Sequence, residues 1–267
     1  MKKKQLEKQC FDLTVKFIEN NVNDKSRKYI KSIFPICSQY IQDEKPDFVI
    51  NTANCSYLIE HFMIDYCNDG INNDQSQSRR AERDIHDIYL RYHDDEIGTV
   101  KDEEISSALS DLENEMNKVV NLSSDFDYGK YVNACKRTFL KHYDNISEYK
   151  QNSNATNDKL KMGFLIEFHN DTTLAEGVYN GSKVRFSGKQ KMFPMTRDIM
   201  DIFSQSYDLD FIIVSQFNMG VLTEAKDVKI YEPNNMGKSI EKQRIRVYDS
   251  VCFPKIDKNI HFKLEDK

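Results

Sequence analysis

Two acidic residues, Asp47 and Glu60, have the residue type and the spacing needed to hold a divalent metal ion. Asp47 opens the segment 47–53 and Glu60 lies within 57–65, and both segments are rich in β-branched and aromatic residues. The Asn-Cys-Ser turn between them predicts two antiparallel strands. A hairpin register can bring the carboxylates together at one sheet edge, where two carboxylates and a main-chain carbonyl would bind Mg²⁺ or Mn²⁺ and leave positions for water and a phosphate.

The sequence Pro46-Asp47-Phe48, followed after a short turn by Ile59-Glu60-His61-Phe62, resembles the signature of the PD-(D/E)xK nucleases. The resemblance is confined to residues 46–62 and implies that Asp47 and Glu60 bind the metal, while the His61 carbonyl completes the ligand set. It also implies a restriction-endonuclease-like fold, in which a mixed central α/β sheet is flanked by helices.

The chain departs from the signature at Phe62, where the family carries a lysine that helps to activate water. A phenyl ring cannot stabilise developing negative charge, so either another cation replaces the lysine or the site only binds. The resemblance also implies an acid from the first helix, for which Glu7 and Glu19 are the alternatives. The candidate replacement cations are Arg79 and Arg80, which we assign to the catalytic set, together with Arg83 and Lys31.

The remaining elements follow from apolar periodicity. Two helices are predicted within 5–43, and a proline-free region predicts a helical insertion at about 74–152 inside a single α/β domain spanning 1–267. Thr196 is the expected cap of a helix ending at 205. Further strands are expected at 163–169, 210–217, 228–231 and 245–251, with a loop between the last two.

Two other groups of residues could bind metal. Glu167 and His169 are two residues apart in an expected strand and therefore share a face. They form a second metal site, join the first, or make a buried ion pair. His86 and His93 share a helical face near acidic residues, but they lack the compact H-x-x-x-H spacing of a zinc site, and a solvated helix end is the alternative.

A basic segment with interleaved aromatic residues is the best candidate for a nucleic-acid contact. Lysine and arginine release counterions from phosphates, and aromatic rings stack on exposed bases. A solvated basic hairpin is the alternative interpretation. The segment contains Lys183, Arg185, Lys189, Lys191 and Arg197, with Phe186 and Phe193 between them, and a weaker second cluster contains Lys238, Lys242, Arg244 and Arg246.

Composition excludes several classes of protein. The net charge of −5 does not indicate an overall nucleic-acid binder, and six cysteines without a C-x-x-C pair predict free thiols. No segment approaches the roughly 18 apolar residues of a membrane span, and no apolar stretch follows the basic start. We therefore expect a cytoplasmic protein with no membrane partner. High Lys, Asn, Ile and Asp content suggests a bacterial origin.

These features predict a nuclease-like protein that hydrolyses phosphodiester bonds of DNA, or of RNA, with Mg²⁺ or Mn²⁺, in defence or repair. The alternative is a non-catalytic binding or regulatory protein on the same scaffold, which contacts a protein partner through the helical insertion. Phe62 favours this alternative.

Overall fold

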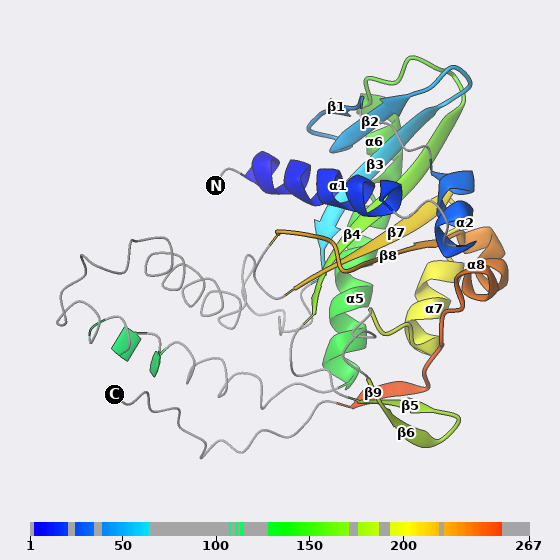
Figure 1. Ribbon diagram of the computed structural model, residues 1–267. Coiled ribbons are helices and arrows are strands. Elements are labelled where there is room, and N and C mark those ends of the chain that lie inside the picture. The colour runs from blue at the N-terminus through cyan, green and yellow to red at the C-terminus, as the bar shows by residue number, and fades with distance from the viewer. Residues whose placement is uncertain are drawn as a thin grey trace.

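A six-stranded mixed sheet with the strand order β1-β2-β3-β4-β7-β8 forms the centre of the protein (Figure 1). The computed structural model describes residues 3–20, 25–34, 39–64, 107, 110–111, 113–114, 128–170, 176–186, 193–218 and 222–252. Helices flank the sheet, which confirms the predicted α/β class with a mixed sheet. The strands are β1 (Ile41–Gln42), β2 (Phe48–Asn51), β3 (Ser56–Met63), β4 (Leu160–Asn170), β7 (Phe211–Asn218) and β8 (Asp227–Tyr231).

The register of β2 and β3 places two acidic residues level with each other. Strands β1, β2 and β3 pair antiparallel, with Phe48 opposite Ile59, which confirms the predicted hairpin. Strand β4 is parallel to both β3 and β7, and β8 is antiparallel to β7. Asp47 immediately precedes β2, so the same register sets it level with Glu60, in the carboxyl-terminal half of β3.

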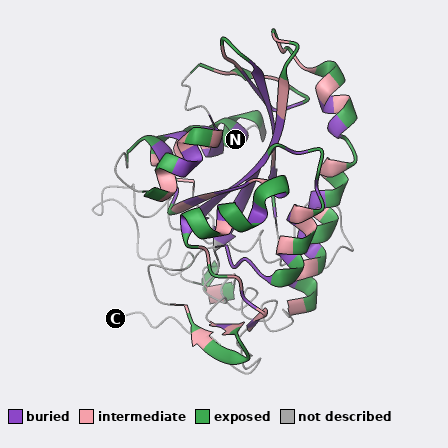
Figure 2. Ribbon diagram, turned by 90° about the vertical axis from the view of Figure 1, so that its right-hand side faces the viewer, coloured by how far each residue is buried: buried purple, intermediate pink, exposed green. Residues whose placement is uncertain are grey.

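Helices cover both faces of the sheet, and the side chains of β3 alternate between them. On one face, Tyr57 and Ile59 pack with α1 (Lys3–Glu19) and α2 (Lys25–Ile33). On the other face, Leu58 and Phe62 pack with α5, α6 and α7. We call these the α1 face and the α5 face. Figure 2 shows that the buried residues concentrate in the strands between the two helical layers. The helices of the second layer are α5 (Tyr128–Tyr143), α6 (Ile146–Asn152) and α7 (Arg197–Ser204).

Helix α1 is held against the sheet by one apolar side. Cys10, Phe11, Val15 and Ile18 recur at helical intervals and are buried, and Phe11 stacks on Phe48 of β2 at 4.5 Å between ring centroids. Burying one such phenyl side chain contributes about 1.5–3 kcal/mol. This packing places the residues of the buried side of α1 beside the ends of β2 and β3.

The carboxyl-terminal part of the chain departs from the expected pattern. Where a loop was expected, a 3-10 turn η1 (Pro233–Asn235) leads into α8 (Met236–Gln243), since proline is compatible with a first helical turn and Met236, Ser239 and Gln243 form a buried side. The strand expected at 245–251 is reduced to an isolated Thr196–Tyr248 bridge and β9 (Ser250–Cys252). Thr196 caps α7 as predicted, accepting a hydrogen bond from the Ile199 N–H.

A second sheet has the order β6-β5-β9, with β5 (Glu176–Tyr179) and β6 (Ser182–Arg185) forming a hairpin. It lies below the carboxyl end of β4 in Figure 1. The four described cysteines, Cys10, Cys55, Cys135 and Cys252, are free thiols. No helix in the described ranges has the length and apolar character needed to cross a membrane.

Candidate metal centre

The described part of the chain buries four carboxylates but no lysine and no arginine. An isolated buried carboxylate is strongly unfavourable unless it is protonated, hydrogen-bonded or bound to a cation. One comes from α1, one immediately precedes β2, one lies in β3 and one lies in β4. They gather around the carboxyl-terminal half of β3. They are Glu7 at 5% exposure and Asp47, Glu60 and Glu167 at 7% each.

Asp47 occupies the central position. Its Oδ2 accepts a hydrogen bond of 2.8 Å from the main-chain N–H of His61, which fixes the carboxylate beside the backbone of β3. Burial raises the pKa of Asp47 to about 7, the charge of Glu60 adds to the increase, Glu7 adds less, and the His61 N–H opposes it. Charges on both faces of the sheet therefore act on this one carboxylate.

Glu60 points to the α5 face. Its Oε1 lies 3.0 Å from Nδ1 of His142 in α5, and that nitrogen lies 3.3 Å from the Tyr149 hydroxyl of α6. The ring of Phe62 stacks on the His142 ring at 4.2 Å with an interplanar angle of 8°. Phe62 thus belongs to the core, where it supports the histidine that contacts Glu60. The buried Oε2 of Glu60 has no hydrogen-bond partner among the described residues.

His61 and Glu167 lie on the α1 face. His61 Nε2 is 3.0 Å from Oε2 of Glu167, and His169 Nε2 bonds the other oxygen of the same carboxylate. Burial alone would raise the pKa of Glu167, but the bonds with His169 and His61 outweigh it, so the pKa is lowered. Burial lowers the pKa of His61, but the hydrogen bond and charge of Glu167, together with the charges of Asp47 and Glu7, raise it by more. The pKa of His61 is therefore above its usual value. The expected Glu167–His169 pair is thus hydrogen-bonded and joined through His61 to the environment of Asp47.

Possible metal ligands form two groups, in each of which all ligand atoms lie within 4.8 Å of one another. One contains Glu7, Asp47 and His61, and the other contains Cys10, His61 and Glu167. Of the two first-helix candidates, Glu7 lies in the site, whereas Glu19 is exposed. Among the described residues Glu60 belongs to neither group, and its link to Asp47 is electrostatic.

Cys10 was not singled out by any motif, and Glu7 was one of two first-helix alternatives between which no motif decided. The available signal was their spacing, since Glu7, Cys10 and Thr14 are three and four residues apart and all three are buried on one side of α1. Without knowledge of how α1 crosses the sheet, this spacing could not be connected with His61.

The predicted cations Arg79 and Arg80 lie outside the described residues, as do Arg83, His86 and His93. Lys31 is a half-buried residue of α2. A different cation, Lys45, stands two residues before Asp47 in the chain, and its Nζ lies 2.7 Å from Oε1 of Glu148 in α6. That hydrogen bond raises the pKa of Lys45, Glu148's charge adds to it, and the charge of Glu60 contributes further.

The predicted basic segment is only partly assembled. Lys183 and Arg185 are exposed on β6, and Arg185 pairs with Glu176. Arg197 begins α7 and pairs with Asp249 at 2.8 Å, whereas Lys189 and Lys191 lie outside the described residues.

The aromatic residues of this segment are less accessible than the sequence suggests. Phe193 is 6% exposed within the core, and Phe186 meets Tyr248 edge to face. Phe193 therefore cannot stack on bases, and a nucleic-acid contact here would depend on the cationic side chains.

Comparisons with known proteins produced no match to a family model, to a curated protein or to a solved structure.

Proposed function

We propose that the protein is a nuclease-like hydrolase with a restriction-endonuclease-like fold, which uses a divalent metal ion to cleave phosphodiester bonds in DNA or RNA. The observation that carries the proposal is the gathering of four buried carboxylates without a buried lysine or arginine among the described residues. The order of elements gives further support, since a helix, an antiparallel hairpin, further helices and a parallel strand follow one another as the resemblance implies.

Two features make the residues around Asp47 suited to Mg²⁺ or Mn²⁺. Asp47 has a raised pKa because it is buried beside other acids, and Glu60 Oε2 is buried without a hydrogen-bond partner among the described residues. A divalent ion would neutralise the buried charge around Asp47 and would give Glu60 Oε2 a partner. Its carboxylate ligands would be Asp47 and either Glu7 or Glu60, and the His61 carbonyl would complete the set. When bound, such an ion supplies charge for the phosphate and a water of lowered pKa.

The residues of the chain would prepare this chemistry before substrate arrives. The His61 N–H fixes the direction of the Asp47 carboxylate, and His142 fixes that of Glu60. We assign the role of the missing motif lysine to Lys45, because its half-exposed side chain follows α1 and α2 in the chain, stands two residues before Asp47 and pairs with Glu148 of α6. Lys183, Arg185 and Arg197 provide exposed positive charge for the phosphate backbone.

A non-catalytic binding function on the same scaffold is the second candidate. The position that carries lysine in the resembling family is filled by Phe62, which is buried and stacked on His142. A scaffold that retains acids for ion binding but packs this position with an aromatic ring would bind nucleic acid or a protein without cleaving it.

A cleavage assay separates the two candidates. Single- and double-stranded DNA and RNA are incubated with Mg²⁺ or Mn²⁺ and either the parent protein, Asp47→Asn, Glu7→Gln or Glu60→Gln. We expect Asp47→Asn to reduce the cleavage rate at least about 100-fold, because it removes the central charge and leaves the shape unchanged. Glu224→Gln, at an exposed acid that pairs with Lys226, is the matched control and should retain the parent rate.

Lys45 provides an independent check of the catalytic assignment. Lys45→Met should lower the rate about 10- to 100-fold, and Lys45→Arg should restore part of it, since the guanidinium keeps the charge. A parent protein that cleaves none of the four substrates with either ion would rule out the hydrolase and leave the binding function.

A further inference from the structure

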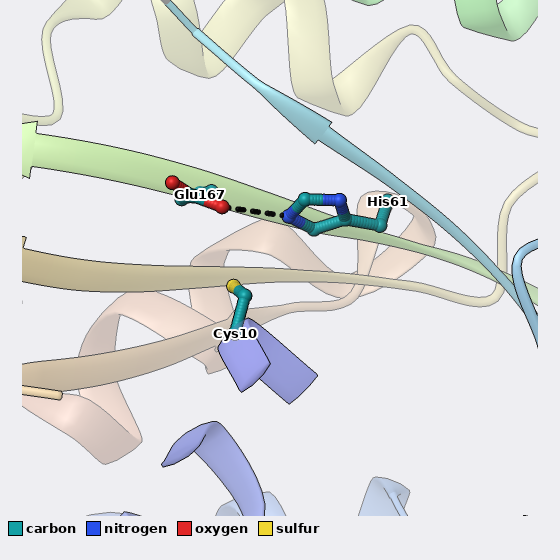
Figure 3. A group of neighbouring side chains, drawn as sticks. All are labelled: Cys10, His61 and Glu167. Atoms are coloured by element: carbon teal, nitrogen blue, oxygen red, sulfur yellow. Dashed lines mark hydrogen bonds and ion pairs between the residues drawn. The ribbon is translucent and has the colours of Figure 1, made fainter. Parts of the chain in front are cut away.

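A second donor set, on the α1 face, has a chemical character different from that of the proposed nuclease centre. The thiol of Cys10, the ring of His61 and the carboxylate of Glu167 offer ligand atoms that all lie within 4.8 Å of one another. Figure 3 shows the Cys10 thiol pointing from α1 toward the His61–Glu167 pair. We propose that these three residues bind Zn²⁺ or a similar thiophilic divalent ion.

The geometry of the three ligands is close to that of a zinc site. With Zn–N, Zn–O and Zn–S bonds of about 2.0–2.3 Å, tetrahedral ligand atoms lie roughly 3.3–3.6 Å apart. His61 Nε2 and Glu167 Oε2 are 3.0 Å apart. Small side-chain rotations, without a change of fold, would therefore open a position for the ion between them and the sulfur.

The donor types and their burial select the ion. A thiolate and an imidazole favour Zn²⁺ over Mg²⁺, which prefers oxygen ligands. Cys10 is fully buried, and the side chains of His61 and Glu167 are 7% and 9% exposed, so bulk water does not compete freely for the ion. Binding exchanges the Cys10 thiol proton for a sulfur–metal bond and releases that proton to solvent.

The surroundings supply the supporting contacts that metal ligands normally require. His169 holds the second oxygen of Glu167, and the carboxylates of Glu7 and Asp47 lie beside the His61 ring. A carboxylate next to a ligating histidine orients the ring and increases its basicity. The site thus has an outer shell formed by residues of α1, β4 and the start of β2.

The three ligands come from three separate elements, α1, β3 and β4, so one ion would connect the helix to the two central parallel strands. Glu7 lies one helical turn before Cys10 on the same side of α1. An ion bound at Cys10 would therefore hold Glu7 next to Asp47. This inference goes beyond the proposed hydrolase activity, because it needs neither Glu60 nor Lys45 and stands if the protein cleaves nothing.

Cobalt substitution tests the proposal on the whole chain, residues 1–267, after treatment with a chelator. Co²⁺ bound by a thiolate gives a near-ultraviolet charge-transfer absorption band, and we expect one equivalent to produce it in the parent. Each cysteine is then replaced singly by serine. Cys10→Ser should remove the band and weaken binding at least about 100-fold, and Glu167→Gln should weaken binding by a similar factor. Cys135→Ser, at a buried cysteine of the α5 face, is the matched control and should retain the band.

Two further measurements make the outcome decisive. X-ray absorption of the zinc-loaded parent needs no variant, and a first shell of only nitrogen and oxygen, or a cobalt band that survives Cys10→Ser, would overturn the proposal. Glu60→Gln should change Co²⁺ affinity less than about threefold, because Glu60 belongs to neither ligand group among the described residues, and excess Mg²⁺ should not displace Co²⁺. Loss of the band through Glu60→Gln or Mg²⁺ would instead assign the ion to the nuclease centre.

Discussion

The two faces of β3 differ in how they accommodate charged residues. On the α5 face, Glu60 is hydrogen-bonded to His142, whose ring stacks on the core residue Phe62. On the α1 face, His61 meets a thiol and carboxylates that come from α1 and β4. The signature read along the chain joins Glu60 and His61, but the two-residue period of a strand sends their side chains to opposite faces. Asp47, beside the β3 backbone, is the residue that connects the two environments.

The largest effect is expected from Phe62→Lys, which places at position 62 the lysine that the resembling nuclease signature carries. Because Phe62 is 6% exposed and packs on His142, Phe139 and Phe164, the change removes aromatic contacts and buries a charge. We expect urea denaturation to show a free energy of unfolding lower by about 3–5 kcal/mol. The carboxylate of Glu60 on this face does not fully offset the cost of burying the ammonium group.

Met63→Lys is the matched control for this change. It places the same side chain one residue further along β3, at a position that is 38% exposed, and should alter stability by less than about 0.5 kcal/mol. If Phe62→Lys were as stable as the parent and more active, position 62 would belong to the catalytic site and the contrast between the faces would be wrong.

The second prediction concerns Asp47 and how the free energy of unfolding depends on pH, measured in the presence of a chelator so that no metal is bound. Between the usual carboxyl pKa of 3.8 and the raised value of about 7, folded Asp47 binds a proton that the unfolded chain has released. Its contribution therefore makes the folded state less stable as pH rises through this window. Asp47→Asn keeps an oxygen that can accept the His61 N–H bond, and should stabilise the protein at pH 8 by about 2–4 kcal/mol.

The difference between the stability curves of parent and Asp47→Asn isolates this group from His61, whose own pKa is also shifted. That difference should be small at pH 4 and should grow toward pH 7. A saturating divalent ion should reduce it, because the ion stabilises only the folded parent. A difference independent of pH would mean that Asp47 is ionised and satisfied without an ion.

Local patterns were sufficient to predict the central part of the fold. The apolar spacing of α1, the turn between β2 and β3, and the Thr196 cap each depend on residues close together in the chain. The second sheet was missed because β9 joins the β5–β6 hairpin from about 70 residues further along, and long-range pairing of this kind leaves no local signal. Helix α8 was missed because Pro233 and Gly237 resemble a loop, although both are compatible with a first helical turn.

The candidate site was predictable only in part, for a related physical reason. Asp47 and Glu60 belong to one hairpin, so their proximity follows from local register, and the shared face of Glu167 and His169 follows from strand alternation. The contact of His61 with Glu167 requires the parallel pairing of β3 with β4, which lie about 100 residues apart in the chain. Cys10 enters only through the packing of α1, which no motif encodes.

The smallest effect is expected at the contact between Thr14 of α1 and Ser215 of β7, which tests whether polar contacts on the α1 face reach β7. The Thr14 hydroxyl donates to the Cys10 main-chain carbonyl and lies 2.7 Å from the hydroxyl of Ser215 on β7, and both residues are buried. Thr14→Val leaves Ser215 without this partner and should cost about 1–2 kcal/mol in urea unfolding, with Ser215→Ala costing a similar amount.

The double variant should cost clearly less than the sum of the two single changes, because removing both partners leaves no unsatisfied buried group. Strict additivity would show that the two hydroxyls do not interact. In that case β7 would make no polar contact with α1 at Ser215. The polar contacts between α1 and the sheet would then be limited to β3 and β4, and so would the contrast with the aromatic α5 face.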